Sequence, residues 1–247
     1  MKTIERPQII VSSTLLLLLL LITLMLSTTG CIRERIEGNY SVGTEERSVS
    51  SFYNLESKGS IHVEIIPSDE TRVEVKAETN VIPYVETWSD GNTMIVEFRD
   101  GYNIHEHYPV EVTLYTPELE NLNLSGSGRI YAGHFNAVNA SVSLSGSGNI
   151  DCSFNAANLD ADVSGSGNLY VEGDTDRGDL RISGSGKIDA GNLACQTCKA
   201  RISGSGNLWV DVEESLEGWI SGSGSIYYYG DPVVISHISG SGRIIRY

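Results

Sequence analysis

Basic residues are scarce in this 247-residue chain: 17 lysines and arginines stand against 32 aspartates and glutamates, and the formal net charge is −15 at pH 7. A protein that binds nucleic acid neutralises phosphates with a stripe of basic side chains. We therefore expect no nucleic-acid partner. A surface of this charge also repels anionic lipid headgroups and favours solubility.

Large core residues and helical patterns are scarce as well. The chain has only four phenylalanines but 26 glycines, while 40% of its residues are hydrophobic. This composition predicts a narrow core. No stretch of twenty residues in the repeats carries apolar residues at three- and four-residue spacing, and two packed helices need about 33 residues or more per unit. An α-solenoid is therefore excluded.

One tetrapeptide, Ser-Gly-Ser-Gly, recurs every 18 to 20 residues, beginning at Ser125, Ser145, Ser164, Ser183, Ser203, Ser221 and Ser239. A fixed period of this length is the signature of stacked structural repeats. The residue before each copy, its two glycines and the second residue after it share one parity, and the two flanking positions are always apolar. In an extended strand these residues face inward and the serines face outward. The glycine pair predicts a tight corner.

Short β segments are the remaining way to build such a repeat. About nineteen residues form one coil of two or three strands, and stacked coils pair each strand in parallel with its equivalents about 4.8 Å away. The seven repeats, residues 125–247, would make a rod about 34 Å long. The predicted fold class is therefore all-β, a parallel β-helix-like solenoid with about 19 residues per coil.

The first thirty residues predict an export signal. Two basic residues precede an apolar run over residues 15–26, which is short for a membrane span and leads into Ser-Thr-Thr-Gly-Cys at 27–31. This ending resembles a lipobox, whose cysteine is lipidated and becomes the mature N-terminus, so Cys31 is the predicted lipidation site. The alternatives are cleavage elsewhere or an uncleaved anchor over residues 9–26. Each of them still places the body outside the cytoplasm.

Residues 31–47 combine many charges with few apolar residues and predict a tether, because such a segment cannot offset the entropy of ordering. Residues 48–124 lack the tetrapeptide but keep short segments in which apolar and polar residues alternate between turn signals. We expect them to form the opening coils of one domain over residues 48–247. Residues 81–88 predict either a short helix or an excursion between strands.

The order of these segments carries a resemblance to a known family. The segments are residues 51–55, 61–66, 73–75, 90–96 and 110–119, and Leu122-Asn123-Leu124 then leads into the first Ser-Gly-Ser-Gly. Over residues 48–247 the chain resembles the head GIN domain family of putative auto-transporter adhesins. The resemblance implies a single β-helix-like solenoid on an exported or lipid-anchored protein, with an adhesin function. It supplies no catalytic residue.

Four aromatic residues are the predicted ligand-binding site. They directly follow the inner apolar residue of their coils: Tyr131, Tyr170, Trp209 and Tyr227. The other coils have Asp151, Asp189 and Ile245 at this position. The shared position predicts one outward stripe that offers apolar rings to a glycan or envelope polymer. Ordinary stacking between coils is the alternative. The outward serines also allow two interpretations. They form a lattice of hydroxyl groups for a repetitive ligand, or they are present because a tight corner requires small residues.

No metal site, cofactor or catalytic residue is predicted. His105 and His107 share a strand face, but no third ligand follows nearby. Carboxylates are abundant, yet none recurs with a defined partner as in the acid pair of a glycosidase. Cys195 and Cys198 could form a disulfide outside the cytoplasm, and Cys152 has the parity of the core. We expect structural roles for all three cysteines.

Together these features predict a non-enzymatic, lipid-anchored protein of the cell envelope that presents a repetitive face for adhesion or ligand binding. A polysaccharide-active enzyme on a β-helix is one alternative. A self-assembling envelope component is another, because open solenoid ends offer unpaired backbone groups to another chain. Arg243 and Arg246 in the last strand would oppose such stacking.

Overall fold

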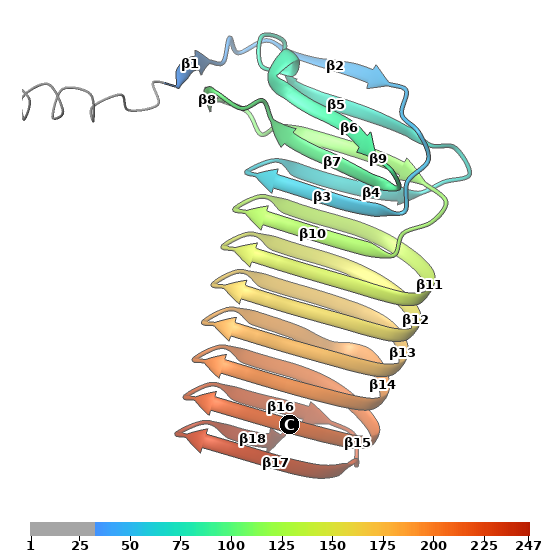
Figure 1. The fold of residues 1–247 in the computed structure, drawn as a ribbon, viewed down its shortest axis with the longest axis vertical. Helices are drawn as coiled ribbons and strands as arrows, with labels where there is room; N and C mark the ends of the chain where they lie inside the picture. The colour runs from blue at the N-terminus through green and yellow to red at the C-terminus, as the bar shows by residue number, and fades with distance from the viewer. Residues whose placement is uncertain (1–32) are drawn as a thin grey trace, which may run out of the picture.

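The computed structural model describes residues 33–247, which form a stack of flattened β coils beneath an N-terminal cap (Figure 1). The predicted export signal and Cys31 lie outside the described residues. Five long strands each make most of one coil: β11 (Arg129–Gly146), β12 (Asn149–Gly165), β13 (Asn168–Gly184), β14 (Lys187–Gly204) and β15 (Asn207–Gly222). Shorter strands complete the stack: β16 (Ser225–Tyr229), β17 (Val233–Gly240) and β18 (Arg243–Arg246). The predicted parallel solenoid with about 19 residues per coil is confirmed.

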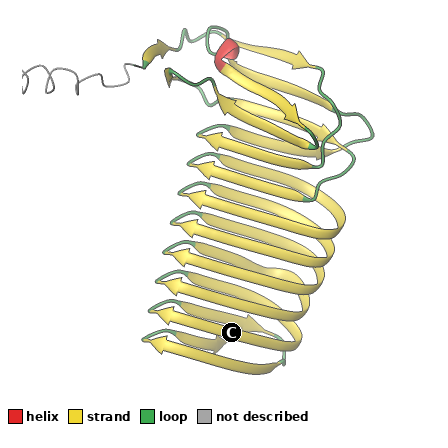
Figure 2. Ribbon diagram, viewed as in Figure 1, coloured by secondary structure: helices red, strands yellow, loops and turns green. Residues whose placement is uncertain are grey.

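Each long strand has two legs, because it bends near its middle (Figure 2). The first four residues of β11 pair with β4 (His62–Pro67), whereas its last six pair with β10 (Asn121–Gly126). The solenoid therefore has a first-leg face, which β16 and β18 continue, and a second-leg face, which β17 continues. The Ser-Gly-Ser-Gly turn joins the second leg of one coil to the first leg of the next.

The cap contains the remaining elements. They are β1 (Glu34–Glu37), β2 (Val42–Arg47), β3 (Asn54–Gly59), β5 (Arg72–Glu78), a 3-10 helix (Ile82–Tyr84), β6 (Val85–Asp90), β7 (Thr93–Phe98), β8 (Tyr102–His105) and β9 (Glu111–Thr116). Stacking order differs from chain order here, since β3 lies between β10 and β7, and β4 lies between β11 and β9. Antiparallel pairs of β2 with β5, β5 with β9 and β6 with β7 complete the cap. The segment 81–88 holds both the predicted helix and part of a strand.

The Ser-Gly-Ser-Gly turn, which we call the glycine corner, is as tight as its glycine pair predicts. In each coil, the carbonyl of the first glycine of the tetrapeptide accepts hydrogen bonds from the next coil: Gly126 O accepts from Ser147 N and from Gly148 N, both at 3.0 Å. Gly165 has a φ of +123°, and a Cβ there would lie 2.5 Å from Gly146 O. The second glycine is buried in every coil from Gly128 to Gly224. Only glycine fits both positions, because a side chain would meet the backbone of the coil above.

The core is a single column of small and branched apolar side chains. The inner residues around the turns, such as Leu124 and Ile130, are fully buried, and Phe154 is the largest of the fully buried side chains. Cys152 is buried in the same column, as its parity predicts, and Cys195 and Cys198 are buried there too. Within residues 33–247, no helix has the length and apolar character needed to cross a membrane.

The charged tether predicted for residues 31–47 is wrong for most of that range. β1 pairs in parallel with β8, and β2 pairs antiparallel with β5. Backbone hydrogen bonds to an existing sheet edge order such a segment whatever its side-chain charges are. Arg47 adds to this, because its guanidinium donates to the backbone carbonyls of Ile82 and Val85. The composition of the segment could not reveal the edge that receives it.

A buried carboxylate fixes the chain between β1 and β2. Glu78 is fully buried and accepts hydrogen bonds from Tyr40 N at 2.6 Å and from His107 N at 2.8 Å. The Tyr40 ring stacks on the His107 ring at 3.7 Å, and His107 Nδ1 lies 3.2 Å from Glu78 Oε1. Burial alone raises the pKa of Glu78, but these hydrogen bonds outweigh it and hold the pKa below its ordinary value.

We expect Gly165→Ala to destabilise the solenoid. The substituted residue would adopt a left-handed conformation and press its Cβ against Gly146 O, which costs about 1–3 kcal/mol for the backbone alone. Ser166→Ala is the matched control at the exposed tip of the same turn and should change stability by no more than about 0.5 kcal/mol. Chemical denaturation measures both. Equal stability of the two variants would contradict the role of the glycine corner.

Glu78→Gln should loosen residues 34–47. Because the folded-state pKa of Glu78 is lowered, its ionised form stabilises the cap at pH values above the unfolded pKa of about 4.3, and this contribution is lost as the pH falls through the folded pKa. Hydrogen exchange at pH 7 should therefore be faster in β1 and β2 of the variant. Acid should also destabilise the cap of the variant less than it destabilises the cap of the wild type. Glu64→Gln, exposed on β4 and away from β1 and β2, is the control. Unchanged exchange in Glu78→Gln would refute this account.

Candidate functional site

The outward side chains of the coils stack in register, so that equivalent residues form columns along the solenoid. On the first-leg face one column runs through Tyr131, Asp151, Tyr170, Asp189, Trp209, Tyr227 and Ile245. On the second-leg face another runs through Ser143, Asp162, Arg181, Arg201, Trp219 and His237. These two columns contain the most distinctive exposed chemistry of the coils.

The first column contains the predicted binding residues, which we call the aromatic stripe: Tyr131, Tyr170, Trp209 and Tyr227. The structure brings three of them into one connected group. Trp209 and Tyr227 stack with ring centroids 4.9 Å apart, and Lys187 Nζ lies 4.8 Å from the ring centroids of both Tyr170 and Trp209. Tyr131 is separate from this group, because Asp151 lies between it and Tyr170 in the column.

Lys187 is the residue of this face that sequence reasoning missed. It follows the turn directly, so its side chain reaches sideways between two aromatic rings, and its ammonium also pairs with Asp189 at 2.8 Å. Burial lowers the pKa of Lys187, but Asp189 and Tyr170 outweigh this effect and raise it. The lysine is therefore charged at neutral pH.

The stacking limits what the stripe can offer to a ligand. Trp209 directs one ring face toward Tyr227 and the other toward Lys187, so its faces are already covered. Tyr131 and Tyr170 are more open, with exposed fractions of 52% and 39%. Cross-coil stacking, the alternative interpretation, is present at Trp209 and Tyr227. The rings available to a ligand are those of Tyr131 and Tyr170.

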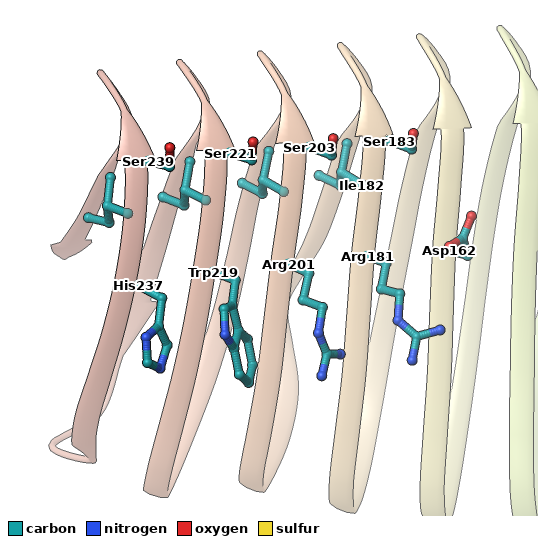
Figure 3. A pocket seen from close by; sticks show the side chains of 13 residues that line it. Asp162, Arg181, Ile182, Ser183, Arg201, Ser203, Trp219, Ser221, His237 and Ser239 are labelled. Atoms are coloured by element: carbon teal, nitrogen blue, oxygen red, sulfur yellow. The ribbon is translucent and has the colours of Figure 1, made fainter.

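The second column borders a groove of about 690 Å³ on the second-leg face. One wall is a row of exposed serines: Ser183, Ser203, Ser221 and Ser239. The other wall, which we call the arginine-tryptophan ladder, consists of Arg181, Arg201, Trp219 and His237 on β13, β14, β15 and β17 (Figure 3). Asp162 lies at the β12 end of the groove.

The ladder is held together by stacking and by one shared carboxylate. The Arg201 guanidinium lies 4.5 Å from the Trp219 ring centroid, and the Trp219 and His237 rings are 5.3 Å apart at an angle of 15°. Asp179 accepts hydrogen bonds from Arg181 Nη2 and from Arg201 Nη1. The side chains of the ladder are thus ordered before any ligand arrives.

Sequence reasoning did not single out the ladder. The signal was present, because each of its residues stands two positions before a Ser-Gly-Ser-Gly and has the outward parity of the serines. Residue types in this column vary from coil to coil, however, and nothing in the sequence indicates that unlike residues at one position stack on each other.

The other motifs that the sequence offered, the histidine pair and the cysteines, make contacts within the fold. Among the described residues, no group of three or more His, Cys, Asp or Glu side chains could hold a metal ion. His107 contacts Glu78, whereas His105 contacts Asn103. Cys195 and Cys198 are free thiols, and Gly178 in the preceding coil leaves room for them. Their mutual hydrogen bond lowers the pKa of Cys195 and, with burial, raises that of Cys198.

Solved structures share this fold. A putative adhesin from Bacteroides fragilis aligns with a TM-score of 0.82 at 22% identity, covering 86% of this chain and 100% of that chain. A putative lipid binding protein from Parabacteroides distasonis aligns with a TM-score of 0.74 at 26% identity, covering 87% and 100%. A putative adhesin from Parabacteroides merdae aligns with a TM-score of 0.68 at 21% identity, covering 87% and 99%.

The comparison with curated proteins gave no match. The family model "Putative auto-transporter adhesin, head GIN domain" matches residues 51–232. This range extends from the opening coils past β16 and includes the aromatic stripe and most of the ladder. The chain therefore belongs to the head GIN domain family of putative auto-transporter adhesins.

Proposed function

We propose that the protein is a non-enzymatic recognition module of the cell envelope, anchored to the membrane by a lipid on Cys31, which binds a glycan through its first-leg face. The observation that carries this proposal is the aromatic stripe. It repeats one outward position in register, at about 4.8 Å per coil, on a chain of an adhesin-head family. A repetitive surface of this kind suits a repetitive ligand.

The chemistry of the stripe favours carbohydrate. A sugar offers apolar C–H groups to an aromatic ring and hydroxyl groups to polar neighbours. The exposed rings of Tyr131 and Tyr170 flank Asp151, which is also exposed and can accept hydrogen bonds from hydroxyls. Lys187, beside Tyr170, adds a donor. Asp189, held by Lys187, supports an ordered binding surface rather than a free catalytic acid.

Export and anchoring rest on the sequence of residues 1–31. A basic start, an apolar run and a lipobox-like ending belong to a lipoprotein signal. Such an anchor would leave the solenoid outside the cytoplasm, where an adhesin meets its ligand.

We expect the mature wild-type chain to begin at Cys31 and to carry the mass of a lipid, and Cys31→Ser to lose that mass because serine has no thiol. Cell fractionation and the intact mass of both chains test this. A wild-type chain that stays in the membrane, retains residues 1–30 and carries no lipid would support the uncleaved anchor over residues 9–26 and contradict lipidation.

Binding should depend on the stripe. The full-length protein in detergent is applied to an array of neutral glycans and envelope polymers, together with a variant in which Tyr131, Tyr170, Trp209 and Tyr227 are alanine. We expect the variant to bind about ten-fold more weakly or worse, since lost ring contacts of about 1.4 kcal/mol in total reduce affinity by that factor.

Trp88→Ala is the matched control, because Trp88 is an exposed aromatic residue of the cap, with an exposed fraction of 44%, far along the chain from the stripe. It should bind as the wild type does. If the stripe variant binds glycans as strongly as the wild type, the first-leg face is not the glycan-binding site. Cleavage of any glycan on the array would overturn the non-enzymatic function.

A further inference from the structure

The ladder places two like charges side by side. Arg181 and Arg201 are directly in register on β13 and β14, and strands in a sheet are about 4.8 Å apart. Like charges directly opposite each other destabilise a sheet. Asp179 offsets part of this repulsion by accepting from both guanidinium groups, and Asp162 stands in register with Arg181 at the β12 end of the groove. An anion bound in the groove would meet the guanidinium N–H donors that these carboxylates leave free.

The orientation of the ladder decides which atoms a ligand would meet. Arg201, Trp219 and His237 stack along the solenoid axis, so their planar faces are covered by one another. Their edges are left for a ligand, and arginine, tryptophan and histidine each have N–H donors at the edge of the planar group. Each arginine has further N–H donors beyond the one that Asp179 takes. The guanidinium fork matches a carboxylate with two parallel hydrogen bonds, which makes arginine the preferred partner of that group.

The charge of the rest of the protein restricts where an acidic ligand can bind. With a net charge of −15, most of the surface repels an acidic ligand. Arg181 and Arg201 place two guanidinium groups side by side on this surface, and Lys199 lies in the neighbouring column, between Asp179 and Glu217. A polyanion would be excluded elsewhere and held at this groove, which gives orientation as well as affinity.

We propose that the groove beside the arginine-tryptophan ladder binds an acidic polysaccharide, a carbohydrate chain with carboxylate groups, that runs along the solenoid axis. Carboxylates of the polymer accept hydrogen bonds from Arg181 and Arg201, and sugar hydroxyls face the row Ser183, Ser203, Ser221 and Ser239. This inference rests on the proposed function as a glycan-binding module but assigns a second face and an acidic class of ligand.

Two other polyanions fit the groove less well. Nucleic acid needs many phosphate contacts, and two arginines in a chain of net charge −15 do not supply them. An acidic peptide in extended form gains much of its affinity by pairing with a sheet edge. The groove instead lies on a sheet face, where neighbouring strands already pair with one another.

The test uses the full-length protein in detergent with polygalacturonate as the acidic probe and its fully methyl-esterified form as the neutral control. Calorimetry should detect binding of the acid polymer, weakened by added salt because salt screens exposed charges. The methyl ester should bind about ten-fold more weakly or not at all. Equal binding of both polymers, or no binding of the acid form, would overturn the proposal.

Variants locate the site. Arg181→Gln with Arg201→Gln should weaken polygalacturonate binding about ten-fold or more. Arg129→Gln with Arg243→Gln removes the same charge from the first-leg face and should leave binding unchanged. An equal loss in this control would show a general charge effect and contradict the groove. Hydrogen exchange in the second legs of β13 and β14 should slow when polygalacturonate is added to the wild type, and unchanged exchange would contradict the site independently of any variant.

The outcomes separate this inference from the proposed function. If the stripe variant loses neutral glycans but keeps polygalacturonate, both proposals stand. If the Arg181→Gln/Arg201→Gln variant keeps polygalacturonate while the stripe variant loses it, the groove is wrong and the recognition function survives. If no neutral glycan binds but the groove binds the acid polymer, the stripe alone is wrong.

Discussion

The structure depends on one repeated interaction, in which the carbonyl of a glycine accepts two N–H groups from the next coil. Gly126 accepts from Ser147 and Gly148, and the same pattern recurs at Gly146 with Ser166 and Gly167. The contact requires backbones closer than any side chain permits, so both glycines of the turn are obligatory. This corner reverses the chain within four residues and fixes the register of every coil against its neighbour.

Fixed register has consequences for recognition. Next to the turns, the parallel stack puts equivalent residues of successive coils against each other, whatever their chemistry is, and the register shifts lie only nearer the bend. Arg181 must therefore face Arg201, and Trp219 must lie between Arg201 and His237. The same rule that makes the fold regular thus creates ordered columns of donors and rings, already held in position before a ligand binds. Preordered side chains lose less entropy on binding than mobile ones.

The cap forms the N-terminal end of the periodic stack. β3 and β4 already have the register of the later coils, but the next elements turn back in antiparallel pairs. Glu78 and His107 then fix the segment around Tyr40. This connects the solenoid firmly to the end of the chain that the lipid anchor would hold, so that the first described residues are part of the fold and not a loose tether.

The sequence by itself determined the repeat, the inward and outward parities, the tight corner and the membership of the four aromatic residues in one column. These follow from local rules, because strand parity and glycine conformation act within a few residues. Tertiary structure alone decided that residues 34–37 and 42–47 are strands, that Lys187 lies between two rings, and that the ladder of Arg181, Arg201, Trp219 and His237 borders a groove. Each of these depends on a partner about 18 or more residues away, or on an edge that other segments create, and no local pattern encodes such a partner.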